Sequence, residues 1–187
     1  MIMQEDASKE VSAAPGCGMW LGWLVESIAG SLLGWAAGWW LSYRVPGALS
    51  TIAIGLVFGL ALGAFQWLVL RVHLETAWQW IAATATGWGI GFPAGVAAAA
   101  ALGLVGFQFG LLAGAITGAV CGMTQWLALR RQVKDSSWWV LASTFAWATS
   151  LLYFQPGVSW LGAFYGLLSG MVSGTVLFWL IYRPAAE

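Results

Sequence analysis

The sequence predicts an all-α integral membrane protein in which six transmembrane helices form three tandem two-helix hairpins, with both termini in the cytoplasm. Composition, the placement of polar breaks and an internal repeat lead to this prediction. Of the 187 residues, 60% are hydrophobic and only 7% are charged, whereas soluble domains carry about a quarter charged residues. This composition excludes a soluble enzyme, a nucleic-acid binder with a basic face and a disordered chain.

Polar breaks divide the apolar stretch from Met19 to Tyr182 into spans of membrane-crossing length. A helix needs about 20 apolar residues to cross a hydrocarbon core roughly 30 Å thick. The breaks lie at residues 42–46, 71–76, 130–136 and 154–158, with a weaker one at 103–108. They delimit spans at about 19–42, 47–70, 77–102, 107–130, 137–154 and 158–182. Pro93 is expected to kink the third span. Residues 1–18 form a polar cytoplasmic tail, 19–183 one transmembrane domain and 184–187 a C-terminal tail.

An internal repeat is the most specific feature of the sequence. The second span contains Gly55, Gly59, Gly63, Gln66, Trp67 and Arg71, and 59 residues later the fourth contains Gly114, Gly118, Gly122, Gln125, Trp126 and Arg130. The sixth span repeats the pattern loosely, with Gly166, Gly170, Gly174, Trp179 and Arg183 but no glutamine. The odd spans also match, because Trp80, Thr84 and Trp88 correspond to Trp139, Ser143 and Trp147, and more weakly to Trp23 and Ser27. Such periodicity predicts three hairpins, at about 19–71, 77–130 and 137–183.

The distribution of cations predicts the orientation of these spans. Lys9, Arg71, Arg130, Arg131, Lys134 and Arg183 lie on one side, and Arg44 alone lies on the other. Positively charged short loops stay in the cytoplasm, so both termini are expected there. Trp67, Arg71, Trp126, Arg130, Trp179 and Arg183 are predicted to anchor the cytoplasmic interface, where amphipathic rings and cations meet the headgroups.

Rows of glycines at four-residue spacing are predicted to pack the helices closely. Gly30, Gly34 and Gly38 in the first span join the rows listed above, giving four of the six spans a G-x3-G-x3-G pattern. Helices in lipid gain nothing from the hydrophobic effect between them, so close backbone approach at glycine supplies the attraction. The preferred interpretation is packing within this chain, and a closed arrangement of the hairpins would bury equivalent faces. The alternative is a glycine-lined axis that serves as a narrow pore or a slot for a flat ligand.

Three polar residues form the candidate intramembrane site. Glu26 is the one acid inside a span, and intramembrane acids are functional candidates because an unpaired charge there is costly. It is interpreted either as a site for a proton, cation or pigment, or as a structural residue that reaches water or an arginine. Gln66 and Gln125 occupy equivalent positions and are interpreted as structural residues that bond a neighbouring helix or a loop carbonyl.

The sequence lacks the residue sets that catalysis requires. His73 is the only histidine and is expected in a loop, without the cysteine or histidine partners of a metal site. No span holds a histidine or lysine that would activate a nucleophile, and Cys17 and Cys121 fall in separate segments. We therefore expect neither an enzyme nor a metal site.

The unit made of a glycine row, Gln-Trp-Leu-x-Leu-Arg, a short charged loop and Trp-x7-Trp resembles a known group. The group consists of uncharacterised small multi-spanning membrane proteins that are frequent in photosynthetic bacteria. The match covers residues 51–92 and 110–150 well and the first and last spans weakly. The resemblance implies a bacterial inner or photosynthetic membrane and no particular activity.

Three functions are compatible with this sequence. The first is a non-catalytic structural or accessory subunit that packs beside a larger membrane complex or forms homo-oligomers. The second is a transporter or channel for a small solute, because internal repeats often build transporters. The third is a binder of pigment, quinone or lipid, although no cofactor is required by the residues. The lipid bilayer is the expected partner, and nucleic acid is not.

Overall fold

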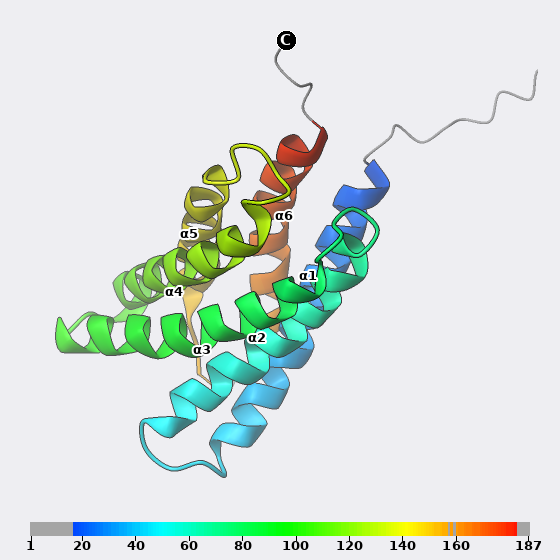
Figure 1. Cartoon of the computed structure of the whole chain (residues 1–187). Helices are drawn as coiled ribbons and strands as arrows, with labels where there is room; N and C mark the ends of the chain where they lie inside the picture. Colours follow the sequence, from blue (N-terminus) through cyan, green and yellow to red (C-terminus); the bar gives the residue numbers. More distant parts are fainter. Residues whose placement is uncertain (1–16, 157, 159, 183–187) are drawn as a thin grey trace, which may run out of the picture.

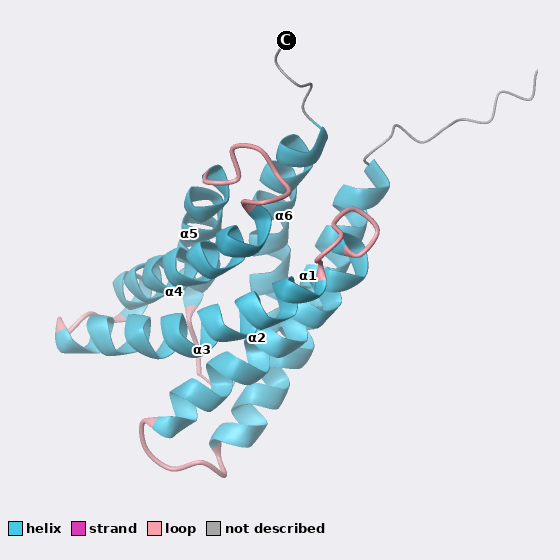
Figure 2. Ribbon diagram, in the orientation of Figure 1, coloured by secondary structure: helices cyan, strands magenta, loops and turns pink. Residues whose placement is uncertain are grey.

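A computed structural model describes residues 17–156, 158 and 160–182, and these residues form helices and no strand (Figures 1 and 2). The helices are α1 (Cys17–Ser42), α2 (Leu49–Leu70), α3 (Trp78–Ala101), α4 (Gly106–Leu129), α5 (Trp138–Ser150) and α6 (Leu161–Tyr182). A 3-10 turn, η1 (Leu151–Tyr153), continues α5. The predicted all-helical fold with six helices is thus confirmed, and most ends agree with the predicted spans to within three residues.

Four of the helices are long and apolar enough to cross a membrane: α1, α2, α4 and α6. This fits the predicted integral membrane protein. α3 is as long as α4, but its Trp, Gln, Gly, Thr and Pro residues lower its mean hydropathy. α5 has only 13 residues, about 20 Å at 1.5 Å per residue, because the chain changes to a 3-10 turn where the predicted span continued to residue 154. α3 passes through Pro93 as one helix.

The six helices form a closed ring in chain order. Each helix packs against the helices before and after it, and α6 packs against α1. We call the end of the ring that carries the loops 71–77 and 130–137 the near end, and the end that carries the loops 43–48, 102–105 and 154–160 the far end. The described chain enters and leaves the ring at the near end (Figure 1).

Glycine rows lie at five of the six contacts around this ring, and each row faces the next helix. The closest neighbours of a Cβ added at Gly30, Gly34 and Gly38 of α1 all belong to α2. The row of Gly55, Gly59 and Gly63 faces α3 in the same way, and that of Gly114, Gly118 and Gly122 faces α5. The row of Gly87, Gly91 and Gly95 in α3 faces α4, and that of Gly166, Gly170 and Gly174 in α6 faces α1. α5 contains no glycine, so the α5–α6 contact is the one built without a row.

Large aromatic side chains fill the inside of the ring in two layers. The near-end layer is built around Trp23, Trp80 and Trp139, and it includes buried residues from all six helices. The second layer is built around Trp35, Phe58, Trp88, Trp147 and Tyr165, and it also draws on all six helices. The glycines therefore lie at the contacts between helices, and aromatic rings occupy the axis.

The two cysteines give a direct measurement of the sidedness that the sequence predicts. Cys17 is exposed at the near end of α1, and Cys121 is buried in α4. If the near end is cytoplasmic, we expect a membrane-impermeant maleimide to label Cys17 only in inverted vesicles, since thiol reactivity requires access. Cys121 should stay unlabelled until the protein is denatured. Labelling of Cys17 from outside intact cells would reverse the predicted orientation.

Candidate functional site

Two equivalent glutamines each join three helices through buried hydrogen bonds. Gln66 in α2 donates from Nε2 to Ser27 Oγ of α1 at 3.1 Å, and its Oε1 accepts from Trp80 Nε1 of α3 at 2.9 Å. The amides are buried because their positions, like the glycine rows, face the neighbouring helices. Each amide therefore satisfies a hydroxyl on one side and an indole on the other.

The second bridge repeats this geometry 59 residues later along the chain. Gln125 in α4 donates to Thr84 Oγ1 of α3 at 2.9 Å, and its Oε1 accepts from Trp139 Nε1 of α5 at 2.9 Å. The two bridges together link α1 through α5. They are hydrogen bonds between side chains on three helices, so the sequence-based interpretation of these amides as structural residues stays the simplest one.

A third bridge, from α6 to α5 and α1, would complete the pattern, but the glutamine is missing. Leu177, fully buried in α6, lies three residues after Gly174, as Gln66 does after Gly63. Ser143 Oγ in α5 is buried without a hydrogen-bond partner. Trp23 Nε1 in α1 donates instead to Ser173 Oγ at 3.0 Å. The α5–α6 contact thus lacks both a glycine row and an amide bridge.

This difference predicts unequal losses of stability for two substitutions. Gln125→Leu should lower the free energy of unfolding by about 1–3 kcal/mol, because it leaves the Trp139 indole N–H without a partner in an apolar interior. Leu177→Gln should cost less than Gln125→Leu, since an amide there can bond Ser143 Oγ. Denaturation in mixed detergent–SDS micelles, followed by circular dichroism, compares the two. Equal losses would contradict the proposed third position.

Three tryptophans meet on the axis just beneath the near end. Trp23 contacts Trp80 at 5.8 Å and Trp139 at 6.0 Å between ring centroids, and Trp80 contacts Trp139 at 5.3 Å. All three pairs are edge-to-face, an arrangement that adds attraction beyond the burial of area. The three indole N–H groups are directed to Ser173, Gln66 and Gln125. The polar bridges therefore fix the orientation of the rings that close the axis.

Glu26 lies apart from the two glutamine bridges. It is half-buried in α1, and its carboxylate has no hydrogen bond or ion pair with any described residue. It is the one charged residue in the six α-helices. The structure thus separates the predicted polar set into two internal bridges and one unpaired acid.

The predicted anchors lie at the near end. The Arg71 guanidinium is 5.3 Å from the Trp67 ring centroid, and Arg130 is 5.5 Å from Trp126. Trp179 is partly exposed near the end of α6, and Arg183 is outside the described residues. At the far end Arg44 stacks on Trp40 at 3.7 Å. Arg44 and Trp40 make the closest of these three stacks.

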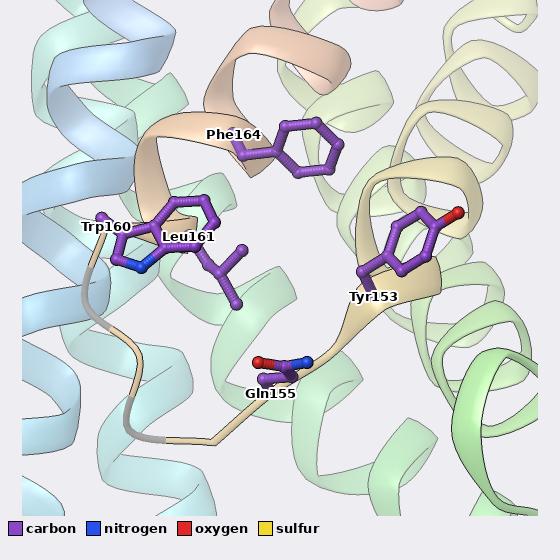
Figure 3. A pocket seen from close by; sticks show the side chains of 5 residues that line it. All are labelled: Tyr153, Gln155, Trp160, Leu161 and Phe164. Atoms are coloured by element: carbon purple, nitrogen blue, oxygen red, sulfur yellow. The ribbon is translucent and has the colours of Figure 1, made fainter.

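An aromatic pocket of about 290 Å³ opens at the far end between η1 and α6 (Figure 3). Its lining residues are Tyr153, Gln155, Trp160, Leu161 and Phe164. Figure 3 shows the rings of Tyr153, Trp160 and Phe164 surrounding the space, with the Gln155 amide near its base. A second groove of about 360 Å³ lies between α1 and α6 at the near end, lined by Cys17, Trp20, Leu21 and Phe178.

Some of these features escaped sequence reasoning. The row of Gly87, Gly91 and Gly95 in α3, which faces α4, was overlooked although its spacing is the same as in the other rows. The aromatic pocket was also missed, because its residues belong to a loop that hydropathy only marks as a break. Within residues 17–156, 158 and 160–182, no three His, Cys, Asp or Glu side chains lie close enough to hold a metal.

No protein-family model, curated protein or solved structure matches this chain, so its function must be argued from the geometry alone.

Proposed function

We propose that the protein is a non-catalytic structural or accessory subunit that packs against a larger membrane complex. The carrying observation is that the two aromatic layers fill the ring while the buried glutamines bond only within it. The hydrogen bonds of these amides thus join helices α1 to α5 to one another. What is left for other molecules is the outer surface, where large apolar side chains and one acid are presented.

This proposal includes six membrane-crossing helices in three hairpins, with both termini cytoplasmic, in a bacterial inner or photosynthetic membrane. In the ring α3 lies between α2 and α4, and α5 lies between α4 and α6. The far-end turn η1 extends the path of α5 by three residues. The positive-inside distribution of Arg and Lys supports the orientation.

The test is purification of the tagged protein from native membranes in mild detergent, with mass spectrometry of the co-eluting proteins. We expect one membrane protein at a fixed ratio to this chain. Elution of the chain alone, from membranes that still contain assembled complexes, would contradict the accessory role.

A second candidate is the binding of a pigment, quinone or lipid headgroup in the far-end aromatic pocket. The observation in its favour is the combination of Tyr153, Trp160 and Phe164 rings with the Gln155 amide, which suits a flat ring that carries a hydrogen-bonding group. Extraction of the native protein with organic solvent would then release one such molecule per chain. A channel or transporter through the ring is supported less, since the aromatic layers would have to separate.

A further inference from the structure

We propose that Glu26 is the docking point for a basic residue in the transmembrane helix of a partner protein. The inference rests on the proposed accessory function and names the chemistry of its partner. It starts from an unusual electrostatic fact: the six helices contain one charged residue, and among the described residues it has no partner of opposite charge. A carboxylate held in or near hydrocarbon requires a cation, a proton or water.

The neighbouring helix in the ring does not supply that cation. Glu26 lies four residues from both Gly22 and Gly30, which face α2. A Cβ on Gly22 would lie 3.4 Å from Val69 Cγ2, and one on Gly30 would lie 3.0 Å from Phe65 Cβ. The stretch of α2 opposite Glu26 is therefore apolar, and Arg71, the nearest cation along it, stacks on Trp67.

The acid is also unnecessary for building the ring. The positions equivalent to Glu26 in the other two predicted hairpins are Ala83 and Ala142, both small and uncharged. The contacts of α3 with α4 and of α5 with α6 form without a carboxylate there. An acid that the packing does not need, and that no described cation of the chain neutralises, fits a surface used by another molecule.

The rest of this surface suits a helix. Leu33 and Trp40 follow Glu26 at seven-residue intervals, which places all three on one side of α1. Leu33 is 54% exposed and Trp40 is 59% exposed. Helices associate in lipid by packing and by interhelical polar contacts, and this side of α1 offers both. The opposing cation belongs in the near-end part of the partner helix, because Glu26 lies in the near-end half of α1.

The first test uses a defined probe. A fluorescent synthetic Leu/Ala helix with one Lys two turns from its near-end terminus is added to vesicles that contain the labelled protein, and energy transfer is measured. A control helix carries Leu in place of that Lys. We expect the Lys helix to bind roughly tenfold more tightly than the control, the size of one interhelical polar contact. The preference should disappear in Glu26→Gln, which keeps the shape and removes the charge.

Equal binding of the Lys helix to the native protein and to Glu26→Gln would overturn the inference. Energy transfer between two copies of the chain that is lost in Glu26→Gln would also overturn it, by identifying a second copy as the occupant.

The native purification separates this inference from the accessory function. A partner that is retained by the unsubstituted chain and lost from Glu26→Gln supports both. If Glu26→Gln retains it, the accessory function stands and the docking point is wrong. If the unsubstituted chain has no partner, the accessory function fails, and the inference about Glu26, which rests on that function, fails with it. Circular dichroism and gel filtration of Glu26→Gln, expected unchanged, establish that loss of the partner is not loss of the fold.

Discussion

Trp80→Ala is expected to lower the free energy of unfolding by about 3–5 kcal/mol, the usual cost of removing a buried tryptophan. Trp80 is 1% exposed, and it contacts both Trp23 and Trp139 on the axis. Its loss also leaves Gln66 Oε1 without a donor, since that atom accepts the indole N–H. Circular dichroism during unfolding in mixed micelles measures the effect without depending on tryptophan emission.

Trp78→Ala provides the matched control two residues away. Trp78 is 63% exposed at the start of the same helix, so its removal should change the free energy of unfolding by only about 0.5 kcal/mol. Trp139 and Trp138 form a second pair of this kind in α5, with 2% and 54% exposure. If both members of a pair cost the same, the axial tryptophans would not be the centre of the near-end core.

Gly59→Ala should destabilise the ring by about 1–3 kcal/mol, as overpacking of a tight contact does. The added methyl would lie 2.6 Å from Thr84 O and 2.8 Å from Ala85 Cα, both backbone atoms of α3. Backbone cannot rotate away as a side chain can, so α2 and α3 must separate. Gly118→Ala should behave alike, because its methyl would lie 2.5 Å from Ser143 O of α5. Thermal unfolding in detergent checks both.

Gly22→Ala is the control for these glycine substitutions. Its methyl would meet only Val69 Cγ2 at 3.4 Å, an ordinary contact with a side chain. In a helix, alanine is also preferred to glycine by about 1 kcal/mol. We therefore expect Gly22→Ala to leave the unfolding temperature unchanged or to raise it. A decrease like that of Gly59→Ala would show that the glycine effect is not steric.

The helices were predictable from sequence because charged and proline-containing breaks are visible in an apolar chain. The predicted end at residue 154 was less accurate, since hydropathy does not distinguish the last turn of α5 from the 3-10 turn that follows. Gln66 and Gln125 were recognisable as a pair from the repeat. Their partners Ser27, Thr84 and the axial tryptophans were not, because identifying them requires knowing which helices are neighbours around the ring.

Glu26 is a second residue whose position could be predicted from the sequence but whose partners could not. Its unusual character follows from composition alone, and its depth follows from its place in the first span. Whether an arginine of the same chain neutralises it depends on side-chain positions. In the structure Arg71, the nearest cation along α2, stacks on Trp67. This observation is what leads to the proposal that Glu26 pairs with a cation of another molecule.

The order of helices around the ring has a consequence for biogenesis. Five of its six seams join helices that are consecutive along the chain, and only the seam between α6 and α1 joins segments distant in sequence. Local seams can form as each helix leaves the insertion machinery, because contacts between consecutive segments carry a small loop-closure cost. Until α6 is inserted, the side of α1 that packs against the glycine row of α6 stays uncovered, and Trp23 stays uncovered with it. Insertion of α6 is therefore the step that closes the ring. A ribosome stalled before α6 would leave an open ring of five helices that quality control can recognise.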